Sequence, residues 1–153
     1  MQRAAIHLPV FPADHGAVPE FNVVIAYEDY RAAERAKQAY DFLVANLVHE
    51  WRVSSQMWKF EVLGNPELRE MAAKDAAQAN LIIVSARGEG ELPAEVKAWI
   101  ELWLGCQGES VALVALFDCS PEAAEHVQEA QGYLEEAASR GRMEFFAWPL
   151  LQT

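Results

Sequence analysis

The chain has 153 residues, a mass of 17.1 kDa and a formal net charge of −11, and 52% of its residues are hydrophobic. This length fits one domain with a sizeable core, and the apolar content excludes intrinsic disorder. The negative charge argues against nucleic acid and anionic membranes as main partners, because both require a basic face. The uncharged apolar runs have the length of strands, so we expect no membrane span.

The N-terminal segment is predicted to be an arm attached to a single domain. Residues 1–20 contain Pro and Gly but no sustained hydrophobic period, which predicts an extended segment, followed by one α/β domain over residues 21–153. His7 and Pro9 interrupt its apolar stretch, whereas a secretory signal needs an apolar segment of about 7–15 residues. We therefore expect a cytoplasmic protein.

In the first half of the domain, strand and helix patterns alternate. Phe21–Tyr27 is a buried strand rich in β-branched residues, and Tyr30–Trp51 is predicted to be a helix with one apolar stripe. Gln56–Leu63 alternates between apolar and charged residues, which predicts a half-exposed strand at a sheet edge. A helix follows to about Gln78, with Asn65 as its N-cap.

The second half repeats the alternation. Leu81–Val84 and Val111–Phe117 are apolar strands, and the helix predicted between them, Leu92–Leu104, has its tryptophans on a core-facing stripe. The last helix is expected over Ser120–Arg140, and the last strand over Met143–Trp148.

This alternation predicts a three-layer α/β fold. Strands connected by helices form a parallel sheet with right-handed crossovers. The half-polar second strand belongs at an edge, which fits a five-stranded flavodoxin-like sheet in the order 2-1-3-4-5. In such sheets, ligands bind beyond the carboxyl ends of the strands, next to strands 1 and 3.

Polar residues follow several of these strand ends and form the candidate ligand-binding rim. The acids could hold a metal or a polar ligand, and the arginine offers a fork for a carboxylate or phosphate. The alternative is that the acids cap helices and face water, and that the glycine-containing loop 85–91 is a mobile connector. The rim candidates are Glu28, Asp29, Ser85, Arg87, Asp118 and Trp148.

The sequence predicts no metal site and no cofactor. Its two cysteines, Cys106 and Cys119, lack CxxC spacing, and its four histidines are scattered. Neither GxxxxGK[ST] nor GxGxxG is present at the strand ends, so a nucleotide-binding loop is not indicated.

At these positions the chain resembles a response-regulator receiver domain, over about residues 21–151. Glu28 and Asp29 match the acidic pair with which receivers bind magnesium. Ser85 stands where receivers have the phosphoacceptor Asp, and Trp148-Pro149 stands where they have Lys-Pro. The resemblance therefore implies a non-catalytic, receiver-like signalling or protein-interaction module that lacks phosphotransfer and contacts an unidentified protein partner.

A second resemblance gives an enzymatic alternative. TIR-like and nucleoside deoxyribosyltransferase-like domains place a catalytic Glu on the helix after the third strand, and Glu95 and Glu101 lie on the corresponding segment. This resemblance implies chemistry at an N-glycosidic bond.

Large apolar residues near element ends favour self-association. Such residues are difficult for one domain to bury, and a twofold dimer is the commonest way to cover a self-complementary patch. We therefore predict a homodimer. The alternative is that the N-terminal arm covers these residues within one chain. The residues concerned are Trp51, Trp58, Trp148, Leu150 and Leu151.

Overall fold

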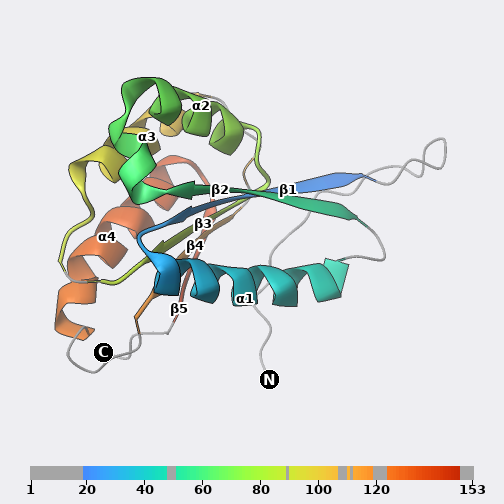
Figure 1. Cartoon of the computed structure of the whole chain (residues 1–153), viewed down its shortest axis with the longest axis horizontal. Coiled ribbons are helices and arrows are strands. Elements are labelled where there is room, and N and C mark those ends of the chain that lie inside the picture. The colour runs from blue at the N-terminus through green and yellow to red at the C-terminus, as the bar shows by residue number, and fades with distance from the viewer. Residues whose placement is uncertain are drawn as a thin grey trace.

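The computed structural model describes residues 19–47, 51–88, 90–106, 110, 112–118 and 124–148. For residues 46, 47, 124–126 and 148 it describes the backbone only. These residues form five strands, four α-helices and one 3₁₀ helix (Figure 1). In chain order they are β1 (Glu20–Tyr27), α1 (Tyr30–Leu47), β2 (Arg52–Lys59), η1 (Phe60–Gly64), α2 (Pro66–Ala77), β3 (Leu81–Ala86), α3 (Ala94–Leu104), β4 (Ala112–Phe117), α4 (Ala124–Arg140) and β5 (Glu144–Trp148).

The sheet confirms the predicted topology. Its strand order is β2-β1-β3-β4-β5 and every pair is parallel. Helix α1 lies on one face of the sheet and α2, α3 and α4 pack on the other, so the described chain is a three-layer α/β structure with a flavodoxin-like order (Figure 1). β2 is at an edge, as its polar pattern predicts.

Each face of the sheet has its own hydrophobic core. Along β1, Val24 and Ala26 pack into the core shared with α2, α3 and α4, whereas Val23 and Ile25 pack towards α1. This alternation is the period of two that buries both faces of a parallel strand. The predicted core role of the α3 tryptophans is confirmed, since Trp99 is 0% exposed and Trp103 is 4% exposed.

The bounds predicted for the second strand are wrong. β2 covers Arg52–Lys59, whereas Phe60–Gly64 is the 3₁₀ helix η1. The alternation of Trp58, Phe60 and Val62 looks like a strand, but Phe60 and Leu63 are the buried pair, at 3% and 0% exposure. Residues three apart share one face of a 3₁₀ helix, so this spacing places both against the core.

The predicted C-terminal end of the first helix is also wrong. The described helix ends at Leu47, and Trp51 lies just before β2 with only 6% of its surface exposed. Its ring meets Phe21 edge-on, with the ring centroids 5.6 Å apart. Trp58 is half-buried and donates its Nε1 hydrogen to Asp75, 3.1 Å away. The domain itself therefore buries Trp51 and partly covers Trp58, two of the tryptophans on which the homodimer prediction rests.

Several other predicted boundaries differ or lie outside the described residues. β1 begins at Glu20, and α3 begins at Ala94, after a buried Leu92. Residues 1–18, the predicted start of the last helix at Ser120 and the C-terminal residues 149–153 are outside the described part. Within that part, no helix combines the length and apolar character that crossing a membrane requires.

Candidate functional site

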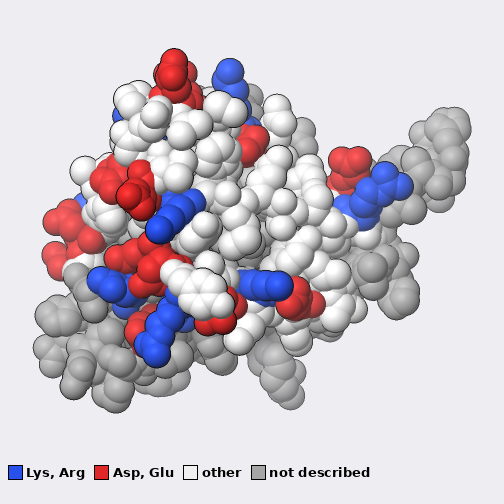
Figure 2. Space-filling model, in the orientation of Figure 1, with Lys and Arg blue, Asp and Glu red and all other residues white. Residues whose placement is uncertain are grey.

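The structure brings four of the rim candidates together where β1 and β3 end. These strands are neighbours, and their register places Tyr27 beside Ser85. The amide of Glu28 donates to the carbonyl oxygen of Ser85 at 3.0 Å, so the two loops leave the sheet together. Charged side chains of both signs gather around this end of β1 and the start of α1 (Figure 2).

Arg87 connects the two acids. Its Nε lies 3.7 Å from Oε2 of Glu28, and its Nη1 lies 3.6 Å from Oδ2 of Asp29. Its backbone amide also donates to Oε1 of Glu28 at 2.7 Å. The acids are about one-third exposed and Arg87 about half exposed, so the positive charge between them lies at the surface of the rim. A cation supplied by the chain therefore occupies the space between the two carboxylates.

Asp29 has a structural role as well. Its Oδ1 accepts a hydrogen bond from the amide of Ala32 at 2.9 Å. This geometry is that of an N-cap, which satisfies a free amide in the first turn of α1. Asp29 thus caps α1, as one of the two interpretations of its position predicts. The same carboxylate also contacts Arg87.

Ser85 is sealed beneath the rim. It is 0% exposed, and its hydroxyl donates to the carbonyl oxygen of Ala32 at 2.8 Å. This contact depends on the close approach of α1 to β3, which the small side chains of Ala32 and Ala36, both 0% exposed, allow. The hydroxyl is therefore used in holding α1 to β3.

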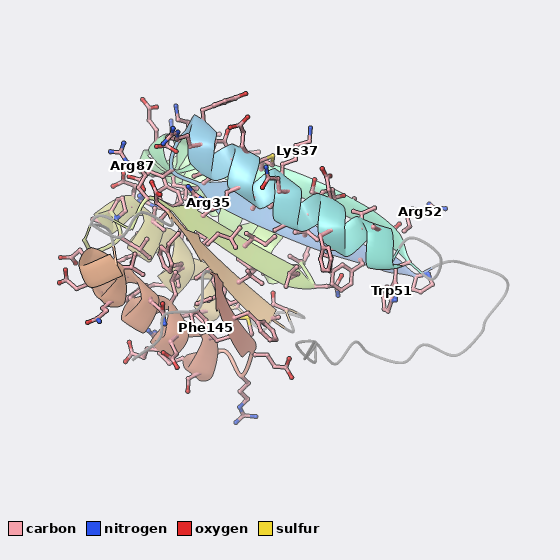
Figure 3. All side chains as sticks on the ribbon, turned by 90° about the horizontal axis from the view of Figure 1, so that it is seen from below. Arg35, Lys37, Trp51, Arg52, Arg87 and Phe145 are labelled. Atoms are coloured by element: carbon pink, nitrogen blue, oxygen red, sulfur yellow. The ribbon has the colours of Figure 1, made fainter. Side chains whose placement is uncertain are left out.

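Arg35 is a rim residue that the sequence reasoning misses. Its Nη1 lies 3.5 Å from both the Ser85 hydroxyl and the carbonyl oxygen of Ala86. The pattern of α1 places it beside the buried Ala36, which was a signal that its stem could lie against the sheet. Arg35 and Arg87 come from different elements and both lie near the beginning of α1 (Figure 3).

Gly88 fixes the loop that carries Arg87. It is buried with φ +78°, a backbone conformation that favours glycine. A Cβ at this position would lie 2.5 Å from Cγ2 of Val127 and 3.4 Å from Phe117. The described beginning of loop 85–91 is therefore packed against β4 and α4.

The other rim candidates are spread along the same edge of the sheet. Asp118 follows β4, one strand beyond Ser85, and is half-buried. Trp148 is the last residue of β5, but its side chain lies outside the described part. The structure thus unites the candidates from β1 and β3.

The two glutamates of the enzymatic alternative lie in different settings. Glu95 is in the first turn of α3 and half-buried, whereas Glu101 is near the end of that helix. Both oxygens of Glu101 accept from Arg140, at 2.6 and 3.0 Å, and one also accepts from the hydroxyl of Tyr133 at 2.8 Å. The hydrogen bond from Arg140, followed by that from Tyr133, lowers the pKa of Glu101 from 4.5 to about 2. Glu101 is therefore an ionised link between α3 and α4.

A shallow pocket lies away from the rim, at the C-terminal ends of α2 and α3. Its one hydroxyl, that of Ser110, already donates to the carbonyl oxygens of Ala76 and Ala79 at the end of α2. Among the described residues, no three His, Cys, Asp or Glu side chains converge as a metal-ligand set. The pocket lining consists of Ala76, Ala77, Trp103, Leu104, Cys106, Ser110, Gly141 and Met143.

In the rim, the two acids therefore contact Arg87, and the buried hydroxyl of Ser85 contacts Ala32 and Arg35. Comparisons with protein-family models, with curated proteins and with solved structures found no match.

Proposed function

We propose that this chain is a receiver-like signalling module that lacks phosphotransfer and acts through contacts with other proteins. The observation that carries the proposal is the position of Arg87 between Glu28 and Asp29, at 3.7 and 3.6 Å. In the receivers that the sequence resembles, the corresponding acids bind magnesium. Here the guanidinium of Arg87 supplies one positive charge that both carboxylates share, in the place where a receiver has its metal ion.

Ser85 supports the same proposal. An aspartyl acceptor needs a carboxylate open to a phosphoryl donor, and this position instead has a hydroxyl that is 0% exposed. Because that hydroxyl donates to Ala32, attack on phosphorus would require its hydrogen bond to break and α1 to move away from β3. The rim would then remain in one state, which suits a module that presents a constant surface to a partner.

A phosphorylation assay tests the proposal. The protein is incubated with magnesium and a small acyl phosphate, and its intact mass is measured, with an active receiver domain as the positive control. We expect the positive control to gain a phosphoryl group and this chain to remain unmodified. A stoichiometric, acid-stable or acyl-type phosphoryl adduct that maps to the rim would overturn the proposal.

A second assay tests the enzymatic alternative directly. The paired oxygens of Glu101 do not favour a role in N-glycosidic chemistry, because both already accept hydrogen bonds. If the chain is the non-catalytic module proposed above, incubation with NAD and with nucleosides, followed by chromatography, gives no free base. Base release that is lost in Glu95→Gln or Glu101→Gln would favour an enzyme instead.

A further inference from the structure

Among the described residues, β2 is the edge strand of the sheet, and six of its eight residues are exposed. β2 is an edge strand of eight residues, paired on its inner side with β1 from Arg52 to Lys59. Within the described residues, no backbone hydrogen bond reaches its outer side. An edge without proline or a bulge is a template for another strand, and proteins commonly blunt such edges with charges.

The charges on β2 are at its two ends only. The segment between Arg52 and Lys59 is Val-Ser-Ser-Gln-Met-Trp, in which Ser54 to Met57 are exposed. In the surface view, the area over the middle of β2 is free of charged side chains, which lie towards either end of the strand (Figure 2). Two copies of a chain with net charge −11 repel each other elsewhere, so an uncharged strip is where they can approach.

From this edge we infer that β2 pairs antiparallel with β2 of a second copy, which joins two five-stranded sheets across a twofold axis. A twofold interface must be self-complementary. The orientation of the backbone N–H and C=O groups of β2 limits the registers in which the two strands can pair. The amide of Arg52 donates to Pro19 at 2.8 Å, so the backbone groups of Arg52 face the β1 side.

Because backbone groups alternate along a strand, those of Val53, Ser55, Met57 and Lys59 face outwards. Directly opposed residues in an antiparallel hydrogen-bonded pair must both face the partner. Only registers that pair odd-numbered residues with each other are therefore allowed. The two allowed registers with the longest overlap have their twofold axis at Ser55 or at Gln56.

Neither register brings the cationic ends together. Even-numbered side chains of β2 lie on the face of Trp58, which packs into the core beneath α2 and α3, and odd-numbered ones lie on the face of Val53, towards α1. Arg52 and Lys59 of the two copies consequently project from opposite faces of the joined sheet in every allowed register. Like-charge opposition across the strands, which destabilises a pair, is avoided. This pairing does not depend on the function proposed above.

The test compares oligomeric mass for variants at Ser55. Ser55→Lys places like charges close to the twofold axis, and Ser55→Pro removes an outward amide while leaving the bonds to β1 in place. Gln38→Lys, at an exposed position on α1, is the matched charge control. Light scattering should give twice 17.1 kDa for the wild type and Gln38→Lys, and 17.1 kDa for both Ser55 variants. Circular dichroism verifies that all variants are folded.

A wild type that stays at 17.1 kDa at high protein concentration, or Ser55 variants that remain dimers, would overturn the inference. Disulfide cross-linking then identifies the register of the two β2 strands. It uses a variant in which Cys106 and Cys119 are replaced by serine. Ser55→Cys should form an intermolecular disulfide if the axis is at Ser55, and Gln56→Cys if it is at Gln56. Dimers in which neither cysteine forms a disulfide would contradict the antiparallel pairing.

Discussion

Replacing Gly88 with alanine should destabilise the domain more than the same change at Gly90. Both glycines have positive φ, +78° and +108°, so both substitutions carry backbone strain, of order 1–3 kcal/mol. Only the Cβ at position 88 meets another atom, 2.5 Å from Cγ2 of Val127, whereas position 90 has open space within 4 Å. Forcing an extra carbon into a packed region costs about 1–3 kcal/mol.

The difference between the two variants isolates this contact. We expect a gap of about 2 kcal/mol in the free energy of unfolding, or roughly 4–8 °C in Tm for a domain of this size. Urea unfolding followed by tryptophan fluorescence measures it. In the double variant with Val127→Ala, the cost of Gly88→Ala should fall, because the opposing methyl group is gone. If Gly88→Ala lowers the free energy of unfolding no more than Gly90→Ala does, Gly88 is not closely packed against Val127, and the argument for how Arg87 is positioned fails.

Three further changes test contacts elsewhere in the domain. Asn65→Ala removes the cap that accepts from two amides of α2 and should cost about 1 kcal/mol, whereas Asn65→Asp should retain most of the stability in the same urea assay. Trp58→Phe loses the hydrogen bond to Asp75 and should lower the free energy of unfolding by about 1–3 kcal/mol; an unchanged urea midpoint would contradict that contact. For Glu101→Gln, the folded-state pKa of about 2 lies below 4.5, so the stability contributed by the bond to Arg140 is present above pH 4.5 and is lost as the pH falls towards 2. Urea midpoints of the wild type and this variant should differ near neutral pH and converge in acid, and a gap that is constant with pH would refute the ion pair.

The strand order could be predicted from the sequence because few topologies fit alternating strands and helices with one half-polar strand. The bounds of β2, in contrast, could not be predicted from the sequence. Trp58, Phe60 and Val62 satisfy a period of two, while Phe60 and Leu63 satisfy the period of a 3₁₀ turn, and pairing with β1 decides between them. A single-sequence pattern contains no information about which partner strand extends how far.

The site was predictable in position and less so in arrangement. Glu28 and Ser85 could be placed at one edge because the carboxyl ends of parallel strands meet there. The contact of Arg87 with Glu28 depends on the backbone of Gly88, which packs against Val127 from a helix much later in the chain. Arg35 reaches Ser85 only because α1 lies close to β3, and such distances come from tertiary packing.

The most direct test of the role of Arg87 is a magnesium titration of the isotopically labelled protein, monitored through the amide signals of Glu28, Asp29 and Arg87 in NMR spectra. If Arg87 occupies the space between the two acids, these signals should show no saturable shift, and the Arg87 amide, bonded to Glu28 at 2.7 Å, should keep its protection from exchange. A saturable shift centred on Glu28 and Asp29, accompanied by release of the Arg87 amide, would contradict the account, because magnesium would then displace the guanidinium.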